Sequence, residues 1–280
     1  MAVNPSIQLG TSGNWAIKED NLLAYKQLGN KFFDREFDFS RGTTATFVGR
    51  NGLIQESAID VPRIDFTDDT TGHLLLEPQS TNIIPYSEDF SNGFWAKSGA
   101  SVASGFSSPS GDLSAFKLVE DNSTAGHFIY GSTSIMTAGT DHSFSVRVKA
   151  NEVNTIQLKA FHPNQWAVNS IFNLTTGIAT STLGTSKITE LANGWFDISI
   201  SGEVLITGTT IAMIYLNSDV SYTGDGTSGV YIWGAQLEAL SYATSYIPTS
   251  GSTVTRNQES CNNSGTVNDF NSEEGVLYVE

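Results

Sequence analysis

Short runs in which apolar and polar residues alternate recur along most of this chain, and they limit its fold more than any other feature. HSFSVRVK at 142–149 sets one Phe and two Val residues against Ser, Arg and Lys, and a period of two is typical of a β-strand with one buried face. Trp195 and Trp233 lie on apolar strands and are expected in the core. Many short strands with Gly- and Asn-rich turns between them predict a mostly β protein built on an antiparallel β-sandwich of the jelly-roll type. Further strands are expected at 155–161, 194–201, 210–216 and 229–237.

The N-terminal part of the sequence is expected to form an arm and then β-hairpins. Residues 14–29 favour a short helix, with Asp20 as N-cap and Gly29 just after the last turn. The alternation then returns, and the pair Asn51-Gly52 between two apolar runs is a strong hairpin signal. We therefore divide the chain into an arm at 1–36, a hairpin neck at 37–84 and a jelly-roll sandwich at 85–256.

Residues 257–280 are expected to form a linker that leads into a further β domain. The segment NQESCNNSGTVNDFNSEE is polar with few apolar anchors, whereas GVLYVE has the pattern of an opening strand. A folded domain rarely ends on an unpaired apolar strand. We therefore expect the natural chain to continue past Glu280.

Charge and composition argue against several classes of partner. The 280 residues carry a net charge of −15, with 29 acidic and 14 basic residues. A nucleic-acid binder needs clusters of Lys and Arg to replace counterions, so we expect no nucleic-acid partner. No apolar run approaches the ~20 residues of a membrane-spanning helix, so we expect no membrane insertion.

The sequence has no pattern that predicts catalysis. One cysteine, Cys261, and four widely separated histidines exclude a cysteine-based or HExxH zinc site. Neither GxSxG nor a phosphate-binding loop is present, and the paired acidic residues lie in turns or linkers, as solvated surface residues do. We expect a protein that is not an enzyme.

Trp166 is the main candidate for a ligand-binding residue. It lies in FHPNQWAVN, a polar turn that also offers His162, Asn164 and Gln165 as hydrogen-bonding groups. An exposed aromatic ring with polar neighbours is typical of carbohydrate binding. The alternative is that Trp166 packs in the core or at a sheet edge, as most tryptophans of a sandwich do.

The loop SYTGDGTSG at 221–229 presents a choice between a turn and a metal site. Calcium prefers several oxygen ligands, which Asp219, Asp225 and nearby carbonyl groups could supply. The alternating acidic residues of an EF-hand are absent, and the permissive backbone of glycine explains the loop as a turn. The turn is the preferred interpretation, and Ca²⁺ is the one cofactor left open.

Two long regions resemble a known family, the first of them in two segments. They are FDFSRGTTATFVGRNGLIQESAIDVPRIDF with GHLLLEPQSTNIIPYSEDFSNGFWAK, and GDGTSGVYIWGAQLEALSYATSYIPTSGSTVTR. The first pair resembles a module of head-spike and tail-fibre proteins of tailed bacteriophages. The second resembles the carbohydrate-binding-like jelly roll that follows it there. The resemblance covers residues 37–256 approximately.

The resemblance implies a structural protein on the exterior of a phage particle, assembled in the host cytoplasm. Residues 1–36 would bind other virion proteins, and the distal β domains of a homotrimer would bind a glycan or another receptor on the host surface. No catalytic residue is carried over. Two alternatives stay open: the N-terminal part of a tailspike depolymerase with catalysis beyond residue 280, and a spacer or capsid decoration module without a ligand.

Overall fold

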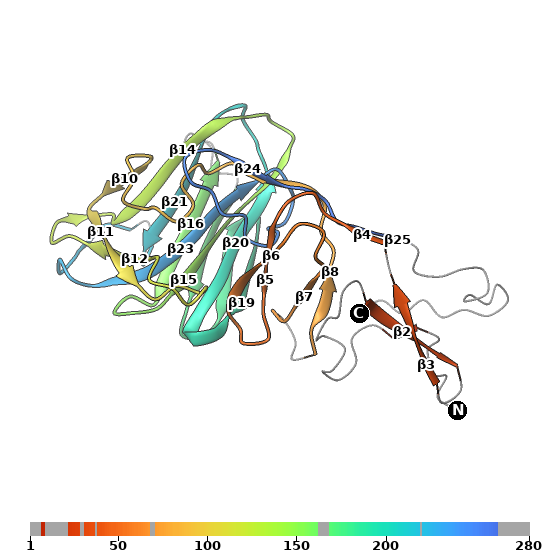
Figure 1. Ribbon diagram of the computed structural model, residues 1–280. Helices are drawn as coiled ribbons and strands as arrows, with labels where there is room; N and C mark the ends of the chain where they lie inside the picture. Colours follow the sequence, from red (N-terminus) through yellow and green to blue (C-terminus); the bar gives the residue numbers. More distant parts are fainter. Residues whose placement is uncertain are drawn as a thin grey trace.

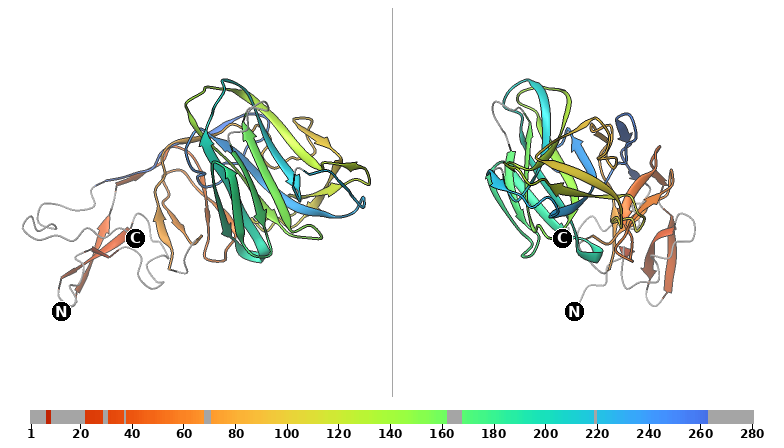
Figure 2. Two further views of the ribbon diagram at one scale, coloured as in Figure 1. Left: turned by 180° about the vertical axis from the view of Figure 1, so that it is seen from behind. Right: turned by 90° about the vertical axis from the view of Figure 1, so that its left-hand side faces the viewer.

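The protein is almost entirely antiparallel β structure over its described residues (Figure 1, Figure 2). The computed structural model describes residues 38–67, 71–133, 135–160, 168–218 and 220–262 in full, and only the backbone at 134, at 161 and in three strands within 7–36. The one helical element of this part is the 3₁₀ turn η1 (Ala192–Gly194), and no helix in it is long and apolar enough to span a membrane. The predicted fold class is confirmed.

Two six-stranded sheets form the sandwich, with the order β10-β14-β21-β16-β17-β18 in the first and β11-β12-β23-β15-β20-β19 in the second. Strands far apart in the sequence, such as β14 and β21, pair within one sheet, so the chain passes repeatedly between the sheets as in a jelly roll. The first sheet consists of β10 (Trp95–Ser98), β14 (Phe128–Met136), β21 (Gly208–Leu216), β16 (Thr155–Phe161), β17 (Val168–Asn173) and β18 (Ile178–Leu183). The second consists of β11 (Ala100–Phe106), β12 (Ala115–Glu120), β23 (Gly229–Glu238), β15 (Asp141–Lys149), β20 (Trp195–Glu203) and β19 (Thr185–Glu190).

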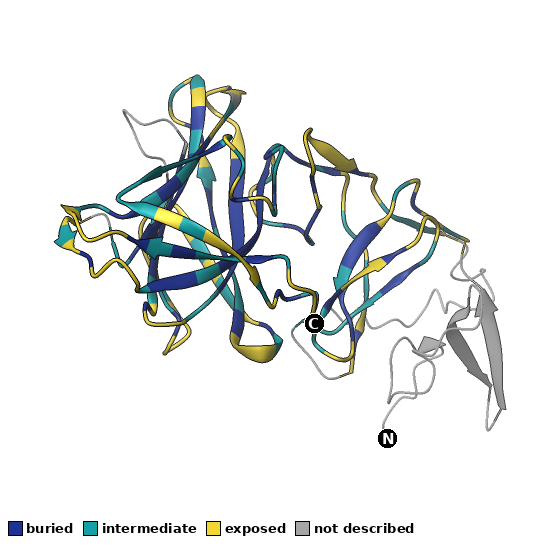
Figure 3. Cartoon of the chain, turned by 60° about the vertical axis from the view of Figure 1, so that its left-hand side comes forward, coloured by how far each residue is buried: buried dark blue, intermediate teal, exposed yellow. Residues whose placement is uncertain are grey.

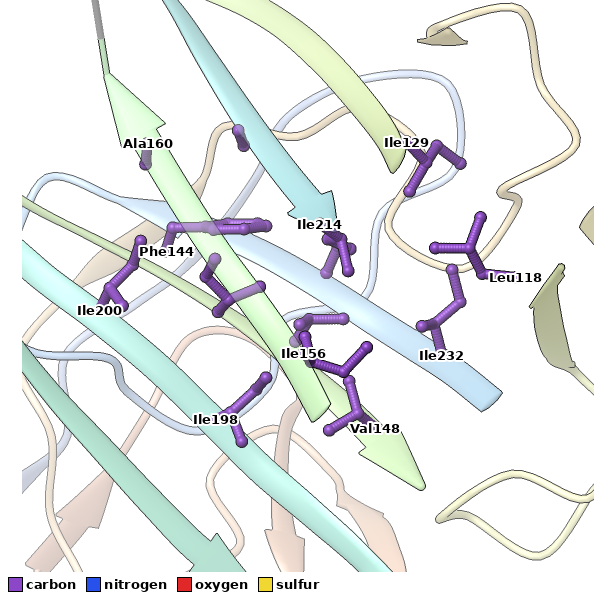
Figure 4. Packing of buried hydrophobic residues seen from close by; sticks show 14 of the residues in the cluster. Leu118, Ile129, Phe144, Val148, Ile156, Ala160, Ile198, Ile200, Ile214 and Ile232 are labelled. Carbon is purple, nitrogen blue, oxygen red and sulfur yellow. The ribbon is translucent and has the colours of Figure 1, made fainter. Parts of the chain in front are cut away.

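The main core lies between the inner faces of the two sheets. Phe144, Val146 and Val148 of β15 are fully buried there, as the alternation predicted. They meet apolar side chains of the first sheet such as Ile156 and Ile214 (Figure 4). Burying a side chain of this size stabilises the fold by roughly 1.5–3 kcal/mol. Figure 3 shows that buried residues follow the strands of the sandwich, whereas exposed residues gather in the connecting loops.

The neck consists of two small hairpins and of strands that the chain adds after it leaves the sandwich. Gly52, with φ 75°, lies in the turn of the first hairpin, which confirms the Asn51-Gly52 signal. The linker expected at 257–280 is in part a strand of the neck, because Ser260–Asn262 pairs with Asp38–Ser40. The rest of that segment, residues 263–280, lies outside the described residues. The pairs are β5 (Ala45–Val48) with β6 (Ile54–Ser57), β7 (Arg63–Asp65) with β8 (His73–Leu75), β9 (Ser80–Asn82) with β24 (Val254–Arg256), and β4 (Asp38–Ser40) with β25 (Ser260–Asn262). A further short pair, β13 (Thr124–Ala125) with β22 (Tyr222–Thr223), joins the loops that precede β14 and β23.

A second, smaller core lies between the neck and the outer face of the second sheet. Val48 and Ile54 of the β5–β6 hairpin belong to the same apolar cluster as Trp195 and Trp233, which are 1% and 3% exposed. The prediction that both tryptophans are buried is confirmed, although they lie outside the sandwich interior. Alternation along a strand distinguishes its two faces, but it does not show that both faces are covered.

The prediction of a helix at residues 14–29 is wrong for Leu22–Leu28. This segment is strand β2, which pairs with β1 (Ile7–Gln8) on one side and β3 (Lys31–Glu36) on the other. Leu28 lies opposite Lys31, so only a Gly-Asn pair separates β2 from β3, and that pair is a hairpin signal. Pairing with the β-prone segment KFFDRE outweighs the modest helix propensity of LLAYKQL. The rest of the expected helix lies outside the described residues.

Five charged side chains form a buried ion network where the neck meets the returning chain. Glu259 binds two arginines, with Oε1 2.7 Å from Nη1 of Arg41 and Oε2 2.5 Å from Nη2 of Arg63. Glu77 binds Arg63 and Arg256, with Oε2 2.9 Å and 2.7 Å from their guanidinium nitrogens. The side chains of Arg41, Arg63 and Glu259 are fully buried, so their charges are compensated by one another and by hydrogen bonds rather than by water.

Candidate functional site

The packing leaves one broad face of the sandwich for a binding site. The inner faces of both sheets form the main core, and the outer face of the second sheet is covered by the neck. The outer face of the first sheet carries the side chains that alternate with the core residues of β14, β21, β16 and β17. Ile129, Leu158 and Ile214 point into the core, so their neighbours along the strands point outward.

Two adjacent rows of residues cross this outer face. In the first row Phe128 lies opposite Tyr215, which lies opposite Gln157. In the second row Tyr130 lies opposite Met213, then Lys159, then Asn169. Positions two apart on a strand face the same way, so the two rows form one surface. We call it the aromatic face and define it by Phe128, Tyr130, Gln157, Lys159, Asn169 and Tyr215.

The side chains of the aromatic face contact one another. The ring centroids of Phe128 and Tyr215 are 4.5 Å apart, and those of Phe128 and Tyr130 are 5.9 Å apart. Nζ of Lys159 lies 5.7 Å from the centroid of Tyr215, within the range of a cation–π contact. Tyr215 and Lys159 are buried, at 9% and 8% exposure, whereas Phe128 and Tyr130 are half-buried and keep part of their rings accessible.

Amide groups continue the face beyond the rings. Nε2 of Gln157 donates a hydrogen bond of 2.6 Å to Oδ1 of Asn169, which fixes both side chains across β16 and β17. Gln157 is only 2% exposed, so the amide available to a ligand is that of Asn169, which is half-buried. Ring surface beside an oriented polar group is a usual component of a small-molecule site. Such a surface can pack an apolar ring face and hydrogen-bond the groups at the edge of that ring.

The residues predicted to bind sugar lie outside the described residues. Trp166, His162, Asn164 and Gln165 belong to the segment 162–167, so their interactions stay a prediction. The strands that flank this segment are β16 and β17, which carry Lys159 and Asn169 of the aromatic face. The segment is therefore joined directly to the two strands that supply the polar part of the face.

Sequence reasoning missed the aromatic residues of this face. Phe128 and Tyr130 flank Ile129 in the run FIY, and two aromatic residues at i and i+2 point to one side of a strand. That spacing was the available signal. The approach of Tyr215 to Phe128 could not be found in this way, because these residues are brought together only by the pairing of β14 with β21.

Asp225 acts as a turn residue in the loop at 221–229. Oδ1 accepts hydrogen bonds from the backbone nitrogens of Thr227 and Ser228, both at 2.7 Å, and Oδ2 accepts one from Oγ of Ser228 at 2.6 Å. The hydrogen bonds from Ser228 and Thr227 hold the pKa of Asp225 well below its usual range. Gly224 is required for a different reason, because a Cβ atom there would lie 2.1 Å from the carbonyl oxygen of Asp121.

The calcium prediction concerns Asp219 as well as Asp225. Asp219 lies outside the described residues. Within the described ones, no group of three or more His, Cys, Asp or Glu side chains is arranged to hold a metal ion. The contacts of Asp225 favour the turn interpretation, and a calcium site that includes Asp219 stays a prediction.

Comparison with known proteins gives no family for this chain. No protein-family model matches, and no curated protein is similar to it. Similar solved structures include the carbohydrate-binding module TmCBM61 in complex with β-1,4-galactotriose, at TM-score 0.34 and 13% identity, covering 56% of this chain and 97% of that chain. TmCBM27, described for specific mannan recognition, gives a TM-score of 0.30 at 9% identity, covering 59% of this chain and 98% of that one.

A third structure is the CBM22-1–GH10 part of xylanase 10B from Clostridium thermocellum with xylohexaose. Its TM-score is 0.31 at 15% identity, covering 56% of this chain and 27% of that chain. The structural neighbours named here are thus carbohydrate-binding modules or contain one. At these TM-scores the likeness does not identify a ligand for this protein.

Proposed function

We propose that the protein binds a carbohydrate through the aromatic face, without catalysis. The observation that carries this proposal is the placement of two half-buried rings, Phe128 and Tyr130, in cross-strand rows that also hold Lys159 and the half-buried amide of Asn169. The C–H side of a sugar ring packs against an aromatic ring, and its hydroxyl groups exchange hydrogen bonds with amide and ammonium groups. A net charge of −15 opposes anionic polymers, so the expected ligand is a neutral glycan.

Replacing Tyr130 by Ala should weaken glycan binding by about tenfold or more, because a central aromatic side chain usually contributes a large share of the affinity of a site. Isothermal titration of the full chain with β-1,4-galactotriose, xylohexaose and a manno-oligosaccharide measures the effect, and circular dichroism checks the fold. Tyr242 is the matched control, since it is a tyrosine exposed to 51% outside the face, and Tyr242→Ala should bind as the wild type does. Equal losses in the two variants, or no binding of any of these glycans by the wild type, would count against the proposal.

We further propose that the protein is carried on the outside of a phage particle as part of a head or tail fibre or spike. The support is the sequence resemblance, and its segments include four of the five members of the ion network: Arg41, Arg63, Glu77 and Arg256. Many copies that each bind a glycan weakly would raise the effective affinity for a host surface. The proposed assembly is a homotrimer, with residues 1–36 as the attachment to other virion proteins.

Light scattering on residues 1–280 tests the homotrimer and should give the mass of three 30.1 kDa chains. Antibodies against the protein test its location and should label the exterior of intact phage particles. A stable monomer would contradict the trimer for this length of chain and favour a decoration module. Degradation of host polysaccharide by a longer form of the protein would favour the depolymerase alternative.

A further inference from the structure

A cleft of about 430 Å³ opens at one end of the sandwich. On the side of the first sheet it is bounded by the turn at 174–177 between β17 and β18, and on the side of the second sheet by the ends of β15 and β19 and the start of β20. Its volume falls within the range of roughly 300–1,000 Å³ that is common for small-molecule sites. The side chains that matter in it are Lys149, Thr175, Thr176, Glu190 and Phe196.

Phe196 provides an aromatic wall in this cleft. It lies opposite Val148, which is fully buried, so Phe196 stands on the core side of β20. Phe196 packs against the main core but is only half-buried, because it lies at the end of the sandwich. Gly177, with φ 66°, lies in the opposite turn, and a Cβ atom there would be 3.9 Å from Cε1 of the ring. One side of the ring thus packs against the main core, and the turn at 174–177 lies next to its edge.

The charged groups of the cleft have no polar partner within the described part of the chain. Across the described residues, neither Lys149 nor Glu190 has an ion pair or a side-chain hydrogen bond, and the same holds for the hydroxyl groups of Thr175 and Thr176. The cleft therefore presents a carboxylate acceptor and two hydroxyl groups beside an aromatic wall. Lys149 lies opposite Trp195 and Tyr231, on the outer side of the second sheet, so it lines the cleft from its outer rim.

In a second cleft, at the loops before β14 and β23, the carboxylates do have partners within the protein. It is lined by Glu120, Glu152, Tyr222 and Asp225, among others. Glu120 accepts hydrogen bonds from Oη of Tyr222 at 2.6 Å and from the backbone nitrogen of Asp225 at 3.0 Å. Glu152 forms an ion pair with Lys117, with Oε2 2.7 Å from Nζ. The carboxylates of that cleft stabilise its loops, which leaves the cleft at Phe196 as the better candidate for a ligand.

We propose that the cleft at Phe196 binds a neutral saccharide ring as a second site, an inference that rests on the proposed carbohydrate-binding function. The ring would pack on Phe196, while neighbouring sugar hydroxyls accept from Lys149 and donate to Glu190. Opposite charges on the two sides match a neutral polyol, whereas an anionic sugar would meet the Glu190 carboxylate. Two sites on one chain add to the avidity that many weak contacts provide.

Nuclear magnetic resonance titration of the ¹⁵N-labelled full chain with galactose, xylose and mannose tests this second site. At least one of the sugars should shift the backbone amides of Thr175, Thr176 and Gly177. Glu190→Gln and Lys149→Met should each weaken this binding by about tenfold, since each removes a hydrogen bond to a charged group. Neither should change shifts at the aromatic face. Glu190 is exposed and Lys149 is half-buried at the end of β15, so the variants should fold.

Glu203→Gln is the matched control, because Glu203 is an exposed carboxylate at the other end of β20 from Phe196. It should bind as the wild type does at both sites. The absence of shifts in the turn at 174–177, or shifts that Glu190→Gln and Lys149→Met leave unchanged, would overturn the second site. Shifts at the amides of Phe128 and Tyr130 report on the proposed function separately, so the two proposals can fail independently.

Discussion

Replacing Glu259 by Gln should lower the free energy of unfolding by about 3–5 kcal/mol, as expected when one partner of a buried ion pair is removed. The carboxylate accepts from Arg41 and Arg63 and also from the backbone nitrogen of Glu77 at 2.9 Å. A glutamine keeps the shape but has one acceptor oxygen and no charge. It would leave two buried guanidinium groups without full compensation, which is far costlier than the loss of a surface contact.

Urea unfolding followed by tryptophan fluorescence measures this loss. Glu152→Gln is the control, because Glu152 also forms an ion pair at 2.7 Å, with Lys117, but its side chain is 49% exposed. The control should cost about 1 kcal/mol or less, since exposed ion pairs contribute little. Similar losses in the two variants would contradict the view that burial makes the Glu259 network essential.

The network also connects the neck to the function proposed for the sandwich. Glu259 follows the sandwich in the sequence and binds Arg41, which precedes it by 218 residues, so both ends of the sandwich are fastened to the neck. The β5–β6 hairpin meanwhile covers the outer face of the second sheet. Together these contacts place the neck against the second sheet, whereas the half-buried rings of Phe128 and Tyr130 lie on the outer face of the first.

Local patterns in the sequence were sufficient for five of the twelve strands of the sandwich, namely β15, β16, β20, β21 and β23. Alternation identified the buried side of β15, and Asn51-Gly52 identified a neck hairpin, because both signals act over a few residues. The helix expected over part of 14–29 failed at Leu22–Leu28 for the same reason: helix propensity is local, whereas strand pairing with Lys31–Glu36 is not.

Contacts between distant segments could not be predicted from single stretches. The buried position of Arg63 depends on Glu259, which lies 196 residues away, and an arginine in a polar segment gives no sign of burial. In the same way Phe128 and Tyr215 form one surface only because β14 pairs with β21. The sequence indicated a sandwich with a carbohydrate-binding surface, but the choice of face depended on where the neck packs.

Acidification should destabilise the protein once the pH falls below about 4.5, and Glu77 should account for part of that loss. Burial raises the pKa of Glu77, but the positive charges of Arg256 and Arg63 and the hydrogen bonds from Ser245 outweigh it, so its pKa in the folded protein lies below the usual 4.5. As the pH falls, the unfolded state therefore binds the proton first. The stability that Glu77 contributes is fully present above its unfolded-state pKa and is lost as the pH falls through its native pKa.

Unfolding free energies of the wild type and of Glu77→Gln at pH 7, 5, 4 and 3 test this expectation. The variant should be less stable at pH 7, by roughly 3 kcal/mol, because Arg63 and Arg256 lose a buried partner. It should also lose less stability than the wild type between pH 5 and pH 3, because it has no carboxylate to protonate at this position. Glu56→Gln, which changes an exposed glutamate of β6, should keep the wild-type pH profile. Parallel profiles for the wild type and Glu77→Gln would assign the acid sensitivity to other carboxylates and separate it from the attachment of the neck.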